Sequence, residues 1–333
     1  MNRIVIGVTL AVLLGIAVAE AQSPPPQSID ELVSQAKAAA GLDWSGTFTR
    51  MCIPPPPAGG RGGGAGGRGG GAPGGPPARA TWYAEPAKVA DNLYFLGTKV
   101  HHSWALVGSD GIIVFEALFE YAAPDEIGEG FRTLGLDTSK VKYIVLSHAH
   151  GDHDGGARFV QDIFQKARMV YGAPDWDAVE KATNRPGGKP RRDLDGTDGM
   201  KMTIGDTSVQ IVTMPGHTAG TLSYLFEIKD HGRPLRVAYV GGTAIPFDAD
   251  AAYYDQYISS SRKMARAAAD FGATVLLSNH TEFDNGYYKA HTAANRKGTD
   301  VPNPFDVGAG GVARYFAVVE NCATAAKLRS ARK

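Results

Sequence analysis

Hydrophobic residues in this 333-residue chain form short runs that glycine-, proline- and charge-rich segments separate. Near the N-terminus, Leu32, Val33 and Ala36 lie on one face of a predicted amphipathic helix over residues 29–40. From there on, short β-branched runs predict strands, and longer one-sided apolar stretches predict helices between them. The continuous apolar run at 143–147 is typical of a strand that is buried on both faces.

The predicted strands fall into two blocks, and helices follow each block. In the first block we predict strands at 92–97, 103–107, 111–115, 143–147 and 169–172, and helices at 123–134, 157–164 and 175–182. In the second block we predict strands at 201–204, 209–213, 221–226, 235–240 and 275–278, and helices at 255–271 and within 303–327. This pattern predicts an α/β (α+β) fold in which two sheets pack together with helices outside.

The first residues have the pattern of a signal peptide. Asn2 and Arg3 form a short charged start, an apolar stretch follows, and Ala-Glu-Ala at 19–21 has the form of a cleavage site. The alternative is an uncleaved membrane anchor, but the apolar stretch is short for a bilayer, which needs roughly 20 residues. We therefore predict a signal peptide at 1–21, export to the periplasm or the medium, and no stable membrane anchor afterwards.

A segment rich in glycine and proline at 54–79 follows the first predicted helix. Such a composition buries too little apolar surface to offset the entropy of ordering the chain, which predicts a disordered or loosely held segment. We therefore expect an N-terminal arm at 22–80 and one larger folded domain at 81–333.

The two cysteines, Cys52 and Cys322, allow only one intramolecular pairing. Export implies an oxidising compartment, so we predict a disulfide that ties the arm to the last helix. The alternative is two unrelated cysteines. Neither cysteine has the spacing of a zinc ligand.

Composition narrows the class of partner. The 34 Lys and Arg residues balance the 34 Asp and Glu residues, so the formal net charge is zero. This balance does not favour nucleic acid or an anionic membrane surface. We expect a small-molecule substrate and a monomeric protein.

Side chains that bind metals gather directly after the buried strand at 143–147. The run His-Ala-His-Gly-Asp-His at 148–153 places His148 and His150 on the same side of an extended segment. The glycine between allows the backbone to turn, so that Asp152 and His153 face a second cation. Zinc prefers imidazole nitrogen with a carboxylate oxygen, and catalytic sites leave one position open for water. The alternative is a polar surface loop with this composition by chance.

Two isolated histidines complete the predicted site. His217 lies in Pro-Gly-His-Thr-Ala-Gly at 215–220, and His280 follows the predicted strand at 275–278. A lone histidine at a strand end is usually only a hydrogen-bonding residue, but here each one supplies a missing ligand. We predict that His148, His150 and His217 bind the first metal, and that Asp152, His153 and His280 bind the second.

With these motifs the chain resembles the metallo-β-lactamase superfamily. The run at 148–153 has that family's H-x-H-x-D-H form, and 215–220 is similar to its third-ligand loop. The resemblance extends from about residue 82 to about residue 328. It implies a four-layer αββα sandwich as the catalytic domain, with two Zn²⁺ ions per chain or other divalent transition metals. The chain is most similar to subclass B3 enzymes and B3-like relatives, which have histidines across both sites.

The chain departs from the family pattern after the predicted strand at 235–240. Many members carry a metal-bridging aspartate there, but Gly242 occupies that position in this sequence. The departure argues against glyoxalase II-like thioesterases and homoserine-lactone lactonases, which use that aspartate. B3 β-lactamases often have serines nearby that hold the carboxylate of the drug, and this chain has Gly242 and Ala244 instead. This departure argues against a serine-based site for the drug carboxylate at these positions.

Weaker predictions concern residues around the metals. Relatives usually have an aspartate where this chain has Glu116, and we expect Glu116 to orient the ligand loop. The alternative is a solvent-facing carboxylate. We predict that His102, Thr243 and Arg192 contact the substrate. The alternative is that these side chains have a structural role or face the solvent.

The resemblance implies that a metal-bound hydroxide, oriented by Asp152, opens the β-lactam amide, an activity that confers antibiotic resistance. A second hypothesis is another hydrolase of this fold, acting on lactones, esters or phosphodiesters. A third is a non-catalytic zinc-binding protein. The sequence contains no G-x-S-x-G motif and no cysteine placed near a base, so we expect no protein nucleophile.

Overall fold

The structure, a computed structural model, describes residues 27–55 and 75–332. The predicted signal peptide at 1–21 and most of the glycine-rich segment lie outside the described residues. Among the described helices, none combines the length and the hydrophobicity that a membrane span requires.

Two mixed β-sheets form the centre of the molecule. The first sheet has the strand order β1-β2-β3-β4-β5-β6-β7, with β1 to β4 antiparallel and β4 to β7 parallel. Its strands are β1 (Ala87–Lys88), β2 (Leu93–Phe95), β3 (Trp104–Gly108), β4 (Gly111–Phe115), β5 (Val141–Val145), β6 (Arg168–Tyr171) and β7 (Leu194–Asp195). The second sheet has the order β12-β11-β10-β9-β8. Its strands are β8 (Lys201–Ile204), β9 (Thr207–Thr213), β10 (Leu222–Asp230), β11 (Arg233–Val240) and β12 (Val275–Ser278).

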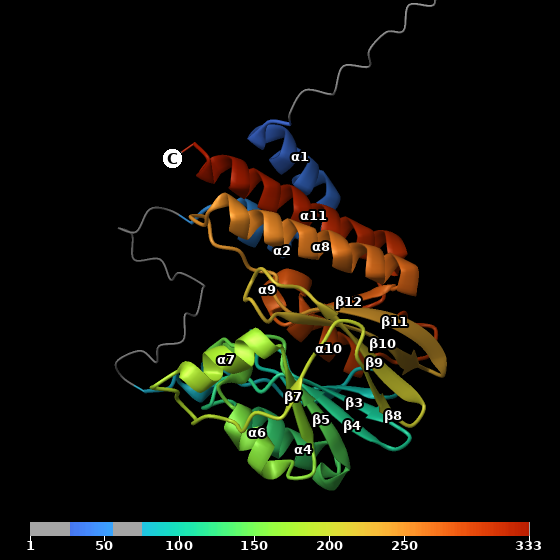
Figure 1. Ribbon diagram of the computed structural model, residues 1–333. Helices are drawn as coiled ribbons and strands as arrows, with labels where there is room; N and C mark the ends of the chain where they lie inside the picture. The colour runs from blue at the N-terminus through green and yellow to red at the C-terminus, as the bar shows by residue number, and fades with distance from the viewer. Residues whose placement is uncertain (1–26, 56–74, 333) are drawn as a thin grey trace, which may run out of the picture.

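Helices cover the outer faces of both sheets, which confirms the predicted four-layer αββα arrangement (Figure 1). On the first sheet lie the π-helix η1 (Pro124–Glu129), α4 (Gly130–Thr133), α6 (Ala157–Ile163) and α7 (Ala173–Lys181). On the second sheet lie α8 (Ala251–Phe271) and α11 (Gly308–Ser330), and the helices α1 (Ile29–Ala40) and α2 (Ser45–Cys52) pack on α11. The remaining helical segments are α3 (Arg79–Trp82), the 3-10 turn η2 (Thr138–Lys140), α5 (Gly151–Asp154), α9 (Thr281–Asp284) and α10 (Gly286–Ala294).

Hydrophobic side chains fill all three spaces between the layers. Between the sheets, Phe115 of β4 stacks on Phe226 of β10 with ring centroids 5.1 Å apart. The side chains at the end of strand β5 alternate between two apolar environments. Val145 points between the sheets, whereas Ile144 points under the helices of the first sheet. The prediction that this strand is buried on both faces is therefore confirmed.

Most predicted elements are present, but some local structure was not predicted. The helix at 29–40 has the predicted bounds, whereas the predicted helix at 123–134 is divided between η1 and α4. The helix α2 was missed because glycine and threonine are weak helix formers. Tertiary contacts stabilise it instead. A side chain at Gly46 would collide with the backbone oxygen of Glu282, so the close approach of α2 to α9 requires glycine there.

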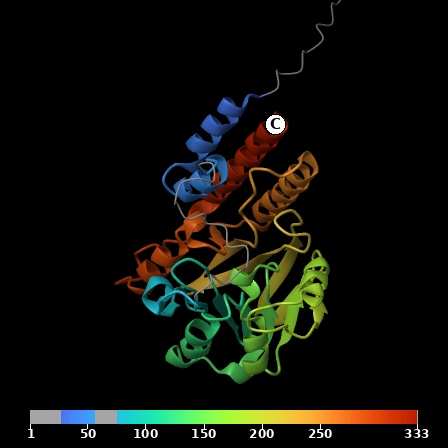
Figure 2. The ribbon, with the colours of Figure 1, turned by 90° about the vertical axis from the view of Figure 1, so that its left-hand side faces the viewer.

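The N-terminal arm is anchored on α11, beside which it lies in both ribbon views (Figure 2). The predicted disulfide between Cys52 and Cys322 is present. Trp44 is fully buried, and its Nε1 donates a hydrogen bond of 2.9 Å to the carbonyl of Gly311. Its ring also meets Tyr315 edge-on, with centroids 5.2 Å apart. The side chains of α1 and α2 thus belong to the same hydrophobic core as those of α8 and α11. The division into an arm at 22–80 and a domain at 81–333 stays a prediction.

We expect reduction of this disulfide to destabilise the protein, because the bond joins residues that are 270 positions apart in sequence. Removing a constraint of this kind typically lowers the free energy of unfolding by about 2–5 kcal/mol. Urea denaturation with and without a thiol reductant measures the difference. The double variant Cys52→Ser/Cys322→Ser is the control, since reductant should leave its midpoint unchanged. Equal midpoints for the native chain under both conditions would contradict the prediction.

Candidate metal centre

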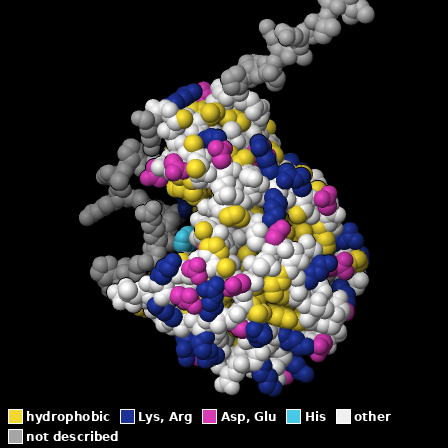
Figure 3. All heavy atoms as spheres, in the orientation of Figure 1, with side chains coloured by type: hydrophobic (Ala, Val, Ile, Leu, Met, Phe, Trp, Pro, Cys, Tyr) yellow, Lys and Arg dark blue, Asp and Glu magenta, His cyan; other side chains and the backbone are white. Residues whose placement is uncertain are grey.

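The predicted ligands come from segments that follow the ends of strands in both sheets. His148 and His150 follow β5 of the first sheet, and α5 carries Asp152. His217 follows β9 and His280 follows β12, both in the second sheet. The ligand-bearing segments of the two sheets therefore meet at one edge of the sandwich. The histidines of these segments are buried or half-buried, and on the face drawn in Figure 3 one small patch of histidine surface is visible.

The first cluster consists of the side chains of His148, His150 and His217, whose ligand atoms all lie within 4.8 Å of one another. The Nε2 atom of His217 is 3.1 Å from both His148 Nε2 and His150 Nδ1. On their other side, the Nδ1 atoms of His148 and His217 each lie 2.7 Å from a backbone carbonyl, of Gly241 and Ala244 respectively.

These carbonyl contacts determine where the imidazole protons lie. A carbonyl oxygen only accepts hydrogen bonds, so the Nδ1 atoms of His148 and His217 carry the protons. Their Nε2 atoms then carry lone pairs that face each other across 3.1 Å. This contact is repulsive unless a cation lies between the nitrogens. The geometry therefore fits a metal ion such as zinc, which binds imidazole nitrogen.

The second cluster is centred on the Oδ2 atom of Asp152. This oxygen lies 3.3 Å from His153 Nε2, 3.4 Å from His280 Nε2 and 3.6 Å from His101 Nε2. The two clusters adjoin, because the rings of His148 and His153 have centroids 4.4 Å apart. The structure thus brings together all six predicted ligands and adds His101, which the sequence did not indicate as a ligand.

Burial lowers the pKa of three predicted ligand imidazoles, whereas for His153 burial is outweighed by the neighbouring Asp152, which raises the pKa. Burial, reinforced by the neighbouring His150, lowers the pKa of His217 to about 4. Burial likewise lowers the pKa of His148 and His280 well below the usual value. A metal binds only the neutral form of histidine, so no proton has to be displaced from these side chains at pH 7. For Asp152, burial acts to raise the pKa, but the surrounding imidazoles outweigh burial and lower it.

Glu116 lies behind the second cluster, where it is completely buried. Its Oε2 atom is 3.8 Å from His153 Nδ1, and its Oε1 atom accepts a hydrogen bond of 3.1 Å from Tyr239. Burial raises the pKa of its carboxyl to about 7. The alternative of a solvent-facing carboxylate is wrong. The contact with His153 supports the orienting role, which stays a prediction.

Asp175 on α7 connects the two ligand loops, and the sequence analysis missed it. Its carboxylate accepts hydrogen bonds from the backbone of Ala149 at 2.8 Å and of Gly220 at 2.9 Å. It also accepts a bond of 2.8 Å from the Thr218 hydroxyl. A Cβ at Gly220 would lie 2.7 Å from Asp175, so glycine is needed for this close approach. No local sequence pattern marks such a contact, because the partners are distant in the chain.

Two predicted substrate contacts are wrong. His102 is completely buried; its Nδ1 donates to the Ser278 carbonyl at 2.8 Å, and its Nε2 accepts from the Thr281 hydroxyl at 2.7 Å. Thr243 is 1% exposed, and its hydroxyl bonds the Tyr315 hydroxyl at 2.7 Å. Both side chains hold the backbone around the ligands and are closed to a substrate.

The structure does not support the third predicted contact, Arg192, either. Its guanidinium is engaged by the carboxylates of Asp177 at 2.7 Å, Asp195 at 3.1 Å and Glu180 at 3.3 Å. A substrate carboxylate would have to displace these partners. Arg192 therefore serves to fasten the loop that precedes β7 onto α7.

The residues after β11 leave no space for a further ligand. A Cβ at Gly242 would lie 2.7 Å from the Cβ of His217, and a Cβ at Gly241 would collide with the backbone of Leu222. Both contacts are shorter than real Cβ contacts, so neither position accepts a side chain without movement of the backbone. Gly241 and Gly242 therefore do not merely lack a carboxylate. Their backbone lies so close to Leu222 and His217 that neither position has space for a side chain.

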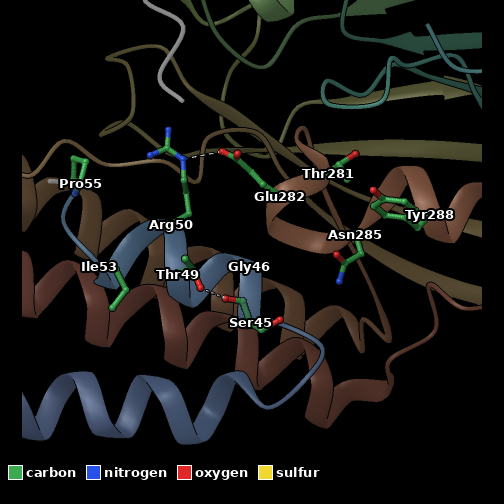
Figure 4. Close-up of a pocket in the computed structure, with 10 residues that line it drawn as sticks. All are labelled: Ser45, Gly46, Thr49, Arg50, Ile53, Pro55, Thr281, Glu282, Asn285 and Tyr288. Atoms are coloured by element: carbon green, nitrogen blue, oxygen red, sulfur yellow. Dashed lines mark hydrogen bonds and ion pairs between the residues drawn. The ribbon is translucent and has the colours of Figure 1, made fainter. Parts of the chain in front are cut away.

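A cavity of about 520 Å³ lies between α2, α9 and α10 (Figure 4). It is lined by Arg50, whose Nε pairs with Glu282 at 2.8 Å, and by Tyr288 and Thr281. Thr281 directly follows His280, but none of the histidines lines this cavity. The space is therefore adjacent to the ligand clusters and separate from them.

Comparison with known proteins agrees with this geometry. Residues 96–233 match the family described as Metallo-beta-lactamase superfamily. The chain is 37% identical over 106 residues to an N-acyl homoserine lactonase AttM of Rhizobium johnstonii, which covers 29% of this chain and 40% of the relative. It is 32% identical over 144 residues to a hydroxyacylglutathione hydrolase of Shewanella baltica, covering 43% of this chain and 49% of the relative. The chain thus spans less than half the length of these curated relatives.

Among solved structures, BJP-1, a subclass B3 metallo-β-lactamase of Bradyrhizobium japonicum, superposes with a TM-score of 0.59 at 25% identity. The superposition covers 70% of this chain and 89% of that structure. This chain therefore has the metallo-β-lactamase fold, and its residues 96–233 match the model of that superfamily.

We expect Asp175→Asn to weaken metal binding, because an amide cannot accept from Ala149 and Gly220 with both of its terminal atoms. Loss of a residue that orients ligands typically lowers metal affinity about 10- to 100-fold. Competition with a chromogenic chelator measures the zinc affinity. Asp177→Asn, on the exposed side of the same helix, is the matched control and should bind as the native chain does. Equal affinities for both variants would show that Asp175 does not position the ligand loops.

Proposed function

Starting from the metallo-β-lactamase superfamily domain, we propose that this protein is a metal-dependent hydrolase that opens the amide bond of a β-lactam ring. The proposal includes two zinc ions, or other divalent transition metals, bound by His148, His150 and His217 and by Asp152, His153 and His280. The observation that carries it is the first cluster, in which the Nε2 lone pairs of His148 and His217 face each other, together with the adjoining second cluster around Asp152 Oδ2. A metal cation between the two nitrogens removes their mutual repulsion.

When bound, the metal ions supply a Lewis acid for the substrate carbonyl and make water nucleophilic at neutral pH. The chain itself holds and orients the reacting groups. The carbonyls of Gly241 and Ala244 lock the rings of His148 and His217 in one tautomer. The Oδ2 atom of Asp152 faces the imidazoles, while its Oδ1 atom is buried without a hydrogen-bond partner among the described side chains and backbone. We assign Oδ1 to accepting the hydrogen bond of the attacking water.

The backbone at Gly242 favours a β-lactam over a lactone or thioester. The aspartate that lactonases and glyoxalase II-like members carry at this position has no space beside His217. The structural likeness to a subclass B3 metallo-β-lactamase, which extends over most of both chains, supports the same choice. The absence of serines at 242 and 244 remains the feature that counts against it.

A second candidate function is the hydrolysis of lactones or other esters. The sequence similarity to proteins named as a lactonase and as a hydroxyacylglutathione hydrolase favours it. That similarity extends over less than half of this chain. The protein would be exported in either case, and the disulfide supports an oxidising compartment.

We expect the purified, zinc-loaded chain to hydrolyse a chromogenic cephalosporin and to lose this activity when a chelator removes the metals. The variant His217→Ala should lower kcat/KM by at least about 100-fold, because it removes a ligand rather than a residue that orients one. Absorbance of the opened cephalosporin measures turnover. His291→Ala, which changes a histidine outside both clusters, is the control.

The outcome separates the candidate functions. Turnover of an acyl-homoserine lactone without turnover of the cephalosporin would replace the first proposal with the second. Chelator-insensitive turnover would contradict both, and silence on every substrate class would point to a non-catalytic zinc-binding protein.

A further inference from the structure

His101 lies in the loop between β2 and β3, and the backbone holds it against the second cluster. It forms an isolated antiparallel bridge with His280. Its own amide donates a hydrogen bond of 2.8 Å to the Thr98 hydroxyl, and its carbonyl accepts one of 2.7 Å from the Thr98 amide. The position of His101 is therefore tied to that of a predicted ligand by main-chain structure.

The side chain of His101 points at the same oxygen as the two predicted histidine ligands. Its Nε2 atom is 3.6 Å from Asp152 Oδ2, compared with 3.3 Å for His153 and 3.4 Å for His280. Ligand atoms about 2.1 Å from a tetrahedral zinc ion lie about 3.4 Å apart. All three distances are close to this spacing. The ligand atoms of His101, Asp152 and His280 also lie within 4.8 Å of one another.

From this geometry we propose that His101 is a fourth protein ligand of the second metal, together with Asp152, His153 and His280. The inference rests on the proposed two-metal function and adds a ligand that neither the motif at 148–153 nor the late histidine indicates. The ring of Phe119 meets His101 edge-on, with centroids 5.1 Å apart, and so restricts its rotation.

A fourth ligand would make the two metal positions unequal. The second position would be closed by three imidazoles and one carboxylate, as in structural zinc sites. The first position, with His148, His150 and His217, would retain the open coordination place that a catalytic site requires. Substrate would then reach a metal mainly at the first position. The difference between the two positions would depend on His101, because it is the ligand that closes the second one.

Titration of the metal-free chain with Co²⁺ tests the proposal, since its visible absorption reports the number and kind of ligands. The native chain should bind two Co²⁺ ions. The variant His101→Ala should bind the first with unchanged affinity and the second at least about tenfold more weakly, because it has lost a ligand. Added imidazole should restore the native absorption spectrum by occupying the vacated place.

The control is His231→Asn, which changes an exposed histidine in the turn between β10 and β11. Its backbone φ is +51°, a conformation that asparagine tolerates. Circular dichroism of the metal-free variants checks that each has folded, and a misfolded His101→Ala is replaced by His101→Gln, which should show the same selective loss.

The outcomes distinguish this inference from the proposed function. If the native chain binds fewer than two ions, the proposed function fails and the inference fails with it. If the native chain binds two ions and His101→Ala does so with the same affinities and spectrum, only the inference is overturned. Weakened binding that imidazole does not restore would also overturn it, because His101 would then act through a hydrogen bond to Asp152.

Discussion

The carbonyl oxygen of Gly241 accepts hydrogen bonds of 2.7 Å from His148 Nδ1 and from Asn279 Nδ2. Through these two bonds the end of β11 is joined both to the ligand loop of the first sheet and to the residue that precedes His280. Because the carbonyl sets the tautomer of His148, it also directs the Nε2 lone pair toward the metal position. The way the two sheets pack together therefore determines where the Nε2 lone pair of His148 points.

The hydrogen bonds that hold the predicted ligands also keep their polar side chains buried, where water cannot solvate them. Neutral imidazoles reduce the penalty, since burying an uncharged ring costs far less than burying an ion. Some strain is also concentrated here. Glu116 and Leu118, at the end of β4, have φ values of +64° and +61°, although neither is glycine. Conformations of this kind cost of order 1–3 kcal/mol each, and they cluster at functional sites because the surrounding structure enforces them.

The sequence was sufficient to predict the fold class and to select six side chains that the structure brings together, because both depend on local patterns. Alternation and apolar runs mark strands, and four of the ligands stand within six residues. Asp175 could not be predicted, because its role depends on a contact across 26 positions. The neighbouring histidines 101 and 102 show the same limit. Adjacent residues of an extended segment point to opposite sides, so only the register of the loop decides which one faces the metals.

Charge provides a further argument on specificity. With two divalent cations bound, Asp152 would be the one carboxylate among the six predicted ligands, and the other five are neutral imidazoles. A bridging aspartate would reduce this positive charge, and the contact between Gly242 and His217 leaves no space for one. A cationic pocket with low-dielectric walls attracts anions without a dedicated arginine or serine. A β-lactam drug carries a carboxylate and an acyl-homoserine lactone does not. Under the proposed function, the glycine at 242 would favour an anionic substrate through the electrostatic field of the two metals, even though Arg192 and Thr243 are already engaged elsewhere.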